Sequence, residues 1–331
     1  KFMNFDTINC DTALIGCGYW GTNIAKVLTK LKKNKIIVFD ENHSNSIILK
    51  NRFPNNIIIS KKLDYILKSN KIKNTILATP PEQNLKLLKF CIKNKKNIFI
   101  EKPGLKKYSD LIKIKKIKHK QILMFGYIYL FNNNINYLKK YIKSKKNGKI
   151  LYIKFERQNL GPIRNDVSAS YDLSSHDLSI FVYMFNKLPK IIKNTSYAVL
   201  KKDIADISNL GLKFKNFYID INNSWLNPDK IRRITIITDK KMLLFNEMEN
   251  ENKIKIFNKY AQYPKISQFD NKFFNKKAKI YQGKNYSPNV KQNDSLSDEI
   301  KYFFKCVKNK KRPISDINFA LKILKILKKI N

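Results

Sequence analysis

The chain has 331 residues, 43% of them hydrophobic, which is enough for two domains that each bury a core. Its formal net charge of +42 arises from 67 basic and 25 acidic residues. Only six of the basic residues are arginine, and lysine is spread along the whole chain. Because recognition of phosphates and bases favours arginine, we interpret the charge as a solvated surface and expect no nucleic-acid or membrane partner. No apolar run reaches the roughly 18 residues that cross a bilayer, and the first residues lack the apolar core of a secretion signal, so we expect a cytoplasmic protein. The four cysteines form no CxxC pair, so we expect neither a disulfide framework nor a thiolate metal site.

Short apolar runs alternate with longer amphipathic segments in the first part of the chain. The runs predict strands over residues 12–16, 35–40, 56–60, 74–80, 97–103 and 121–126, and the segments between them predict helices over 22–33, 44–52, 62–69, 82–94 and 109–118. This alternation is typical of an α/β fold, in which crossover helices connect the strands of a parallel sheet. We therefore expect residues 1–126 to form a doubly wound domain with its ligand crevice at the carboxyl ends of the strands.

After Gly126 the pattern changes to long β-like runs with few helices between them. These runs cover residues 149–159, 195–202, 209–226, 232–246 and 252–258. They predict an α+β domain over 127–331, built on a mostly antiparallel, open sheet. A helix over 174–185 interrupts the runs, a loop-rich stretch covers 260–293, and two closing helices are predicted over 296–308 and 317–329.

The first chemical motif is a glycine-rich turn directly after the first predicted strand. Gly16, Gly18 and Gly21 have G-x-G-x-x-G spacing, which permits a tight turn, lets the backbone approach a pyrophosphate and lets the next helix pack closely on the strand. Asp40 ends the second predicted strand, where a carboxylate can accept both ribose hydroxyls and repels a 2′-phosphate. An empty turn is the alternative interpretation, but the pattern favours a dinucleotide, and NAD over NADP.

Two further strand ends carry candidate residues. Thr79 and Pro80 end the fourth predicted strand, where a proline pair can form a ledge against a nicotinamide ribose, although an ordinary strand stop explains the prolines equally well. Glu101 and Lys102 end the fifth predicted strand. An ammonium group at this edge can point at a substrate hydroxyl near the nicotinamide, whereas by itself Lys102 is one more surface lysine.

The second half of the chain contributes a histidine with nearby carboxylates. His176, one of three histidines, follows Asp172 by four residues and precedes Asp177. If the helix begins near Ser174, Asp172 lies on the turn before it and His176 lies in its first turns, so both can reach one pocket. A histidine–carboxylate pair suits proton transfer at neutral pH. The alternative is a structural histidine in an amphipathic helix.

These motifs together resemble the glucose-fructose oxidoreductase, inositol dehydrogenase and MocA (Gfo/Idh/MocA) family of NAD(P)-dependent oxidoreductases. The resemblance rests on GCGYWG after the first strand, ATPP after the fourth, EKP after the fifth and D-x-x-x-H-D in the second half, in that order. It implies that Lys102 orients or deprotonates the reacting hydroxyl, that His176 is the principal acid/base, and that Asp172 assists. It also implies that the cofactor is lined by Gly16, Gly18, Tyr19, Trp20, Gly21, Asp40, Thr79, Pro80, Glu101 and Lys102.

Two longer segments, residues 156–181 and 223–243, are similar to the nucleotide-sugar branch of this family, whose members oxidise UDP-N-acetylglucosamine or the matching uronic acid at the 3-hydroxyl. The resemblance implies a sugar or nucleotide-sugar substrate held by Arg157, Asn159, Arg164 and Tyr127, since guanidinium forks suit anionic oxygens.

The chain also departs from the family pattern. Many relatives carry histidine in place of Asn84, and many continue with an Arg-Phe pair after Tyr127; the second difference affects a substrate-facing region. A free cyclitol or aldose therefore stays open as the substrate, as does an NAD-binding regulatory protein without catalysis. The open sheet of the second domain further implies a homodimer or homotetramer.

Overall fold

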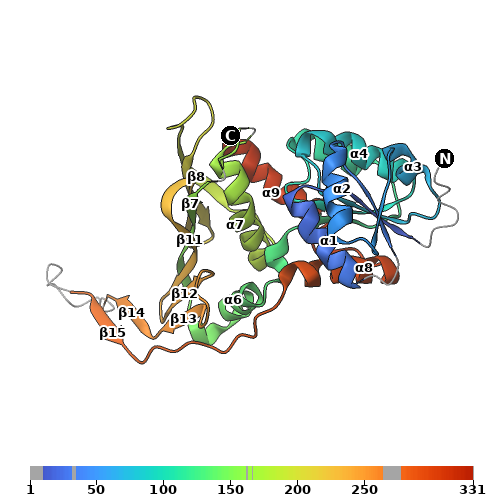
Figure 1. Cartoon of the computed structure of the whole chain (residues 1–331). Coiled ribbons are helices and arrows are strands. Elements are labelled where there is room, and N and C mark those ends of the chain that lie inside the picture. The colour runs from blue at the N-terminus through green and yellow to red at the C-terminus, as the bar shows by residue number, and fades with distance from the viewer. Residues whose placement is uncertain (1–9, 32–34, 162, 166, 264–276, 331) are drawn as a thin grey trace. The chain divides into compact units, whose positions relative to one another are not determined.

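The computed structural model describes residues 10–31, 35–161, 163–165, 167–263 and 277–330. The chain divides into two units, each with its own core (Figure 1). Unit 1 combines the chain up to Phe131 with the later segment Asp294–Lys328. Unit 2 contains Asn132–Asn293 and the last residues from Lys329.

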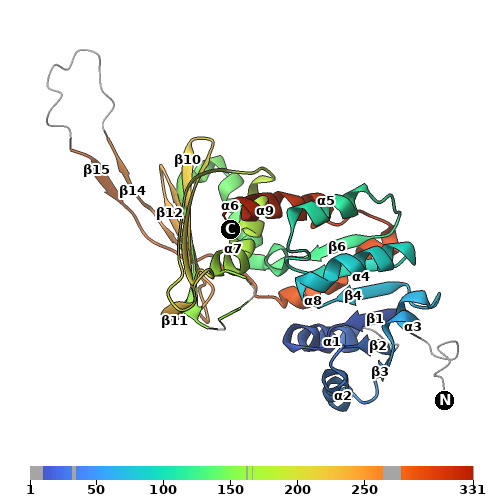
Figure 2. The same cartoon turned by 90° about the horizontal axis from the view of Figure 1, so that it is seen from above.

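Unit 1 is a six-stranded parallel sheet with helices on both faces (Figure 2). Its strands are β1 (Thr12–Ile15), β2 (Ile36–Phe39), β3 (Ile57–Ile59), β4 (Asn74–Leu77), β5 (Asn97–Glu101) and β6 (Leu123–Gly126). The crossover helices are α1 (Tyr19–Leu31), α2 (His43–Arg52), α3 (Leu63–Lys68), α4 (Pro81–Lys93) and α5 (Tyr108–Lys116), and a short 3₁₀ helix, η2 (Ile128–Phe131), follows β6. The strand order β3-β2-β1-β4-β5-β6 reverses between β1 and β4. Ligands of such sheets bind outside the carboxyl ends of the strands at this reversal.

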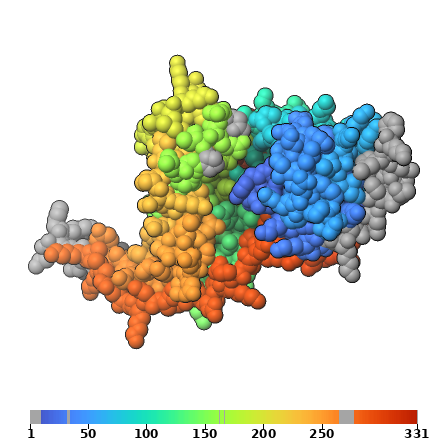
Figure 3. Space-filling view, viewed as in Figure 1, coloured from blue at the N-terminus to red at the C-terminus, as the bar shows by residue number. Residues whose placement is uncertain are grey.

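The two C-terminal helices, α8 (Ser295–Asn309) and α9 (Ile317–Ile330), form as the sequence predicts, but α8 and most of α9 complete unit 1. Ile300 and Phe303 of α8 are fully buried with Leu14 and Phe99 of the parallel sheet, and the Phe99 and Phe303 ring centroids lie 5.9 Å apart. Figure 3 shows the orange-red surface of α8 against the blue surface of α1. The sequence-based division at residue 126 assigned these helices to the second domain. Their apolar stripes predict burial but do not identify the partner.

Unit 2 is a seven-stranded sheet with one face covered by a long helix. Its strands are β7 (Ile150–Leu160), β8 (Lys190–Tyr197), β9 (Ile207–Phe214), β10 (Phe217–Ser224), β11 (Leu226–Thr238), β12 (Met242–Asn246) and β13 (Ile254–Phe257). They lie in the order β13-β12-β11-β7-β10-β9-β8, antiparallel except for β7 with β10. The helix α7 (Ala169–Phe185) contacts β7, β9 and β10, while α6 (Asn133–Lys143) and the short η3 (Lys145–Asn147) precede the sheet.

Three details of unit 2 differ from the sequence prediction. The helix α7 begins at Ala169 rather than near Ser174, because the Ser168 hydroxyl accepts a hydrogen bond from the Tyr171 N–H at 3.2 Å and caps the helix start. The strand β8 lies earlier than the run at 195–202. The stretch predicted as loop contains a two-stranded ribbon, β14 (Lys259–Gln262) with β15 (Lys279–Gln282). Within the described residues, no helix combines the length and apolar character that crossing a bilayer requires.

Candidate active site

The glycine turn between β1 and α1 has two glycines that the fold requires and one that faces open space. Gly16 has φ +94°, and a Cβ there would lie 2.5 Å from the Ala78 carbonyl oxygen. A Cβ at Gly21 would lie 2.0 Å from the Gly16 carbonyl oxygen. At Gly18, by contrast, no atom lies within 4 Å of an added Cβ. Gly16 and Gly21 therefore allow strand and helix to pack, and Gly18 leaves room for a ligand to approach the backbone.

Asp40, directly after β2, joins the glycine turn to the start of α2. Its Oδ2 accepts a hydrogen bond from the Cys17 N–H at 2.6 Å, and its Oδ1 accepts one from the Asn42 N–H at 2.9 Å. The carboxylate is half-buried, so part of it stays accessible beside the turn. A dinucleotide needs N–H groups for its pyrophosphate, space close to the backbone and an acceptor for its ribose hydroxyls. The first turn of α1, Gly18 and Asp40 supply these three features. The residues present therefore fit such a cofactor.

Asn84 holds the ends of β4 and β5 together. Its side chain is 2% exposed. Its Oδ1 accepts a hydrogen bond from the Thr79 hydroxyl at 2.5 Å, and its Nδ2 donates to the Gly104 carbonyl at 2.7 Å. In the sequence, Asn84 stands out only as a departure from the family pattern. Its buried amide ties the loop that carries Thr79 to the loop that follows Lys102.

Glu101 and Lys102 stand at the carboxyl end of β5, as predicted. Lys102 is half-buried. The Glu101 Oε1 atom is buried, and burial raises the pKa of Glu101 to about 7, while the Trp20 indole and the Lys102 charge act in the opposite direction. Glu101 thus connects the strand end with α1, where Trp20 lies next to the 85%-exposed Tyr19. Whether Tyr19, Trp20 and Glu101 line a cofactor stays a prediction.

The helix α7 of unit 2 presents Asp172 and His176 on one face. Residues four apart in a helix are neighbours on its surface, so the two side chains lie one turn apart. Of residues 171–180, they are the two that keep partial exposure. An Asp172 carboxylate oxygen lies 3.6 Å from the Arg164 Nη1. Because the helix begins at Ala169, Asp172 lies inside its first turn rather than before it, and His176 lies about two turns after its start.

Arg157, expected from the resemblance to hold substrate, lies in the core of unit 2. Its Nε and Nη2 donate to the Asp177 Oδ1 at 3.1 and 2.9 Å. Arg157 is 5% exposed and Asp177 is 1% exposed, and the Asn223 amide donates to the other carboxylate oxygen at 3.3 Å. The guanidinium therefore neutralises a buried carboxylate of α7. This contact differs from the predicted one because the fork that suits a phosphate suits a carboxylate equally.

The other predicted substrate residues lie in different environments. Arg164 keeps 36% of its side chain exposed. The Asn159 Nδ2 donates to the Gly161 carbonyl and its Oδ1 accepts from Arg232, a residue that sequence reasoning did not single out. Tyr127 is 1% exposed and its ring centroid lies 5.3 Å from that of Phe319, so the ring forms part of the core of unit 1. Substrate contacts by these residues stay predictions.

Comparisons with known proteins place the first part of the chain near one family of oxidoreductases. Residues 10–129 match the model of the oxidoreductase family with the NAD-binding Rossmann fold, Gfo/Idh/MocA. The chain is similar to the 2,7-anhydro-N-acetylneuraminate hydratase of Escherichia coli (strain K12), with 30% identity over 141 residues. That match spans 42% of this chain and 37% of the relative's length.

Solved structures resemble the whole chain in fold. The UDP-N-acetylglucosamine 3-dehydrogenase from Acidithiobacillus ferrooxidans has a TM-score of 0.79 at 17% identity, covering 96% of this chain and 95% of that one. GenD2 from gentamicin A biosynthesis, solved in complex with NAD, has a TM-score of 0.76 at 14% identity, covering 96% and 91%. Together with the glycine turn between β1 and α1, the match over residues 10–129 shows that this part of the chain is similar to the NAD-binding domain of the Gfo/Idh/MocA oxidoreductase family.

Proposed function

We propose that the chain is an NAD-dependent oxidoreductase that oxidises a secondary hydroxyl of a sugar, the 3-hydroxyl of a UDP-amino sugar. The observation that carries the proposal is the partial exposure of Asp172 and His176 on an otherwise buried stretch of α7, in a chain with a family dinucleotide turn. A polar, titratable pair that a helix leaves accessible while it buries its neighbours is a candidate for chemistry rather than packing. The fold shared with a UDP-N-acetylglucosamine 3-dehydrogenase supports the choice of sugar.

The cofactor would be held by the glycine turn and Asp40. The N–H groups at the start of α1 suit the pyrophosphate, and the open space at Gly18 suits its close approach. The accessible part of the Asp40 carboxylate suits two ribose hydroxyls and disfavours a 2′-phosphate, which is why we propose NAD rather than NADP. When bound, NAD supplies the hydride acceptor.

The protein's own residues would move the proton and position the sugar. The His176 imidazole takes the proton of the reacting hydroxyl, because its ordinary pKa lies close to the working pH. The Lys102 ammonium donates a hydrogen bond to that hydroxyl and holds it in line for transfer. Asp172, one turn before His176, accepts hydrogen bonds from neighbouring substrate hydroxyls. Arg164 beside Asp172 is the cation that we propose for the substrate phosphates.

The decisive experiment follows absorbance of NADH for His176→Gln and Lys102→Met with UDP-N-acetylglucosamine. We expect each variant to lose about two to four orders of magnitude in kcat, as removal of an acid/base group does, while NAD affinity stays within about threefold. His43→Gln, which changes a histidine at the start of α2, is the matched control. Full turnover in both variants would refute the assignment of the acid/base residues.

A panel of substrates separates the proposal from its alternatives. NADH formation with inositol or glucose, and none with UDP-sugars, would favour a free cyclitol or aldose. NAD binding without turnover of any sugar would favour a regulatory protein. The similarity to proteins named hydratases favours a further candidate, a reaction with no net oxidation. In that case an anhydro sugar would be converted without accumulation of NADH, which chromatography of the products would detect.

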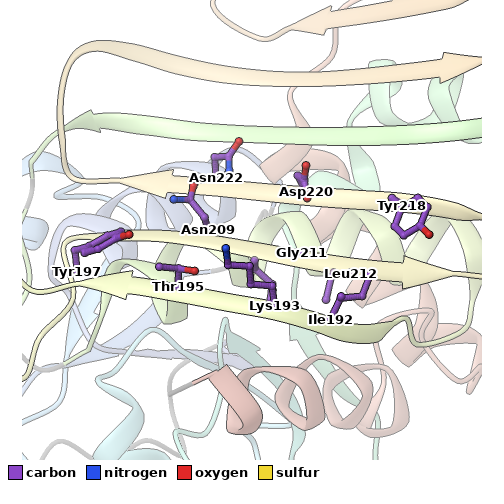
Figure 4. Close-up of a pocket in the computed structure, with 11 residues that line it drawn as sticks. Ile192, Lys193, Thr195, Tyr197, Asn209, Gly211, Leu212, Tyr218, Asp220 and Asn222 are labelled. Atoms are coloured by element: carbon purple, nitrogen blue, oxygen red, sulfur yellow. Dashed lines mark hydrogen bonds between the residues drawn. The ribbon is translucent and has the colours of Figure 1, made fainter.

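We also propose that the chain forms a homodimer or homotetramer through the exposed face of the unit 2 sheet. A hollow of about 480 Å³ on β8, β9 and β10 contains the half-exposed aromatic side chains of Tyr197 and Tyr218 (Figure 4). Lys193 and Asp220 flank Gly211 in the same hollow, each with an atom 3.7 Å from the position of a Cβ there. A patch that holds both charges can pair with a second copy of itself across a two-fold axis.

Light scattering coupled to gel filtration tests this interface. We expect Tyr218→Glu to dissociate the oligomer, and Tyr263→Glu, which changes an exposed tyrosine outside the hollow, to leave the mass unchanged. A monomeric wild type at micromolar concentration would refute the proposal.

A further inference from the structure

Unit 1 contains two glutamates that the proposed reaction does not use, the fully buried Glu299 and the partly buried Glu101. Glu101 is the last residue of β5, and Glu299 lies on α8 with its residue 0% exposed. Three of the four carboxyl oxygens, Glu101 Oε1 and both of Glu299, are buried and have no partner at full hydrogen-bond geometry among the described residues. Buried acidic groups without a compensating cation are rare, because desolvation disfavours their charged form.

The two groups meet at the end of β6. Glu101 lies opposite Gly126 in the register of β5 and β6, and a Cβ added to Gly126 would lie 3.1 Å from the Glu101 Oε1. The backbone N–H of the next residue, Tyr127, faces Glu299. Glycine at 126 therefore leaves space for the Glu101 carboxyl, next to the Tyr127 N–H that faces Glu299.

The charged and polar groups around the pair come from three elements. Glu101 faces the Trp20 indole of α1, the Lys102 ammonium of its own strand end and Glu299. Glu299 faces Glu101 and the Tyr127 N–H. Burial raises the pKa of Glu101 to about 7 and raises the pKa of Glu299 well above its ordinary value, with the charge of Glu101 as a further cause. Two adjacent buried carboxylates cannot both be ionised at low cost, so the pair retains a proton at neutral pH.

We propose that Glu299 is a positioning residue for the strand end that carries Lys102. Its carboxylic acid shares one proton with the Glu101 carboxylate, and this O–H···O bond fastens α8 to the end of β5 and fixes the backbone direction of Lys102. No bond other than the hydrogen bond forms or breaks, and the proton stays between the two oxygens. The catalytic part of this inference rests on the proposed function of Lys102, whereas the shared proton does not.

The shared proton predicts an infrared signature that is independent of any reaction. The wild type should show the C=O band of a protonated carboxyl group at pH 7.5, and Glu299→Gln should lose it. Glu82→Gln, at an exposed glutamate of α4, is the control and should retain the band. A wild type without this band would overturn the proposal whether or not the chain oxidises sugars.

The positioning role is tested by pairing two variants of Glu299. In Glu299→Gln the amide can still donate a hydrogen bond to Glu101, so we expect kcat within about threefold of wild type. In Glu299→Leu the donor is gone, and we expect kcat to fall by about 10- to 100-fold with little change in NAD affinity. Rescue of kcat by glutamine but not by leucine is the result that a merely structural glutamate would not give.

Amide hydrogen exchange supplies the readout if no substrate turns over. Residues 101–104 should exchange faster in Glu299→Leu than in Glu299→Gln, with α8 itself still protected in both. Equal exchange and equal kcat in the two variants would overturn the positioning role. An inactive wild type that shows the carboxyl band and the exchange difference would refute the proposed function and leave this inference standing.

Discussion

Replacement of Arg157 by methionine separates a structural role of this arginine from a substrate-binding one. The side chain neutralises Asp177, with its Nε and Nη2 at 3.1 and 2.9 Å from one carboxylate oxygen, and both residues are at most 5% exposed. Methionine keeps the apolar stem and removes the charge. We therefore expect Arg157→Met to leave Asp177 as an uncompensated buried charge.

The size of the effect follows from what remains around Asp177. The Asn223 amide, 3.3 Å from the second oxygen, is a neutral donor and replaces only part of the lost interaction. Removal of one partner of a buried ion pair lowers the free energy of unfolding by about 3–5 kcal/mol. Changing both residues, as Arg157→Met with Asp177→Leu, removes the buried charge as well and should recover most of this loss, because apolar replacements of such pairs are often neutral.

Urea denaturation followed by circular dichroism measures these differences. Arg233→Met, on an exposed position of β11, serves as the control and should change the free energy of unfolding by less than about 0.5 kcal/mol. If Arg157→Met loses less than about 1 kcal/mol and instead raises KM for a UDP-sugar more than about tenfold, the arginine contacts substrate and our interpretation of the ion pair is wrong.

Three further predictions concern unit 1. Gly21→Ala should destabilise the protein and abolish NAD binding, because its Cβ would lie 2.0 Å from the Gly16 carbonyl oxygen. Gly18→Ala should keep the wild-type melting temperature and weaken NAD binding. Melting curves and calorimetric titration check both variants. Asp40→Asn should lower the ratio of NAD to NADP affinity in the same titration, because the charge that repels a 2′-phosphate is gone. The folded-state pKa of Glu101 is raised from its usual 4.5 to about 7, so the free energy of unfolding should fall as pH rises from about 4.5 to 7. This fall should be about 3 kcal/mol larger in wild type than in Glu101→Gln. Urea titrations across that pH range measure the difference.

The strands of unit 1 and their order of motifs are readable from sequence because their signals are local. Each strand is a short apolar run that ends at a glycine, proline or polar residue, and a run buried on both faces needs no knowledge of its partners. Gly16 and Gly21 are predictable for the same reason, since both serve contacts within one strand–turn–helix unit. The function of the turn at Gly18 is then inferred from its spacing.

The sequence of β7 carries a signal that Arg157 is buried. In β7, Ile153, Phe155 and Arg157 share the parity that faces α7, and all three are buried. Side chains two apart in a strand point to the same face, so a charge in that series predicts a buried partner. The identity of the partner, Asp177, depends on tertiary packing and is not readable from the strand alone.

The start of α7 could not be read correctly because several residues compete to cap it. Ser168, Ser170, Ser174 and Ser175 all have hydroxyls suited to an N-cap. The first turn of the helix contains the polar Asp172 and Ser170, which weakens its apolar pattern. Ser168 caps the helix because Ala169 and Leu173 are buried against Trp225, a tertiary contact with a residue far along the chain.

The helix α8 is part of unit 1, the unit that contains the glycine turn, although it lies near the end of the chain. Phe99 on β5 and Phe303 on α8 are both fully buried and stack edge to face, so a chain that ended after β6 would expose the apolar side of the parallel sheet that α8 covers. The same helix supplies Glu299, without which Glu101 at the end of β5 has no second carboxyl. Both the core and the strand end that bears Lys102 are therefore completed by residues about 200 positions later in the chain. The segment that matches the family model lies within residues 10–129, but part of the packing around it comes from α8. The resemblance to the family can therefore be predicted from the sequence, whereas the proposed positioning residue cannot.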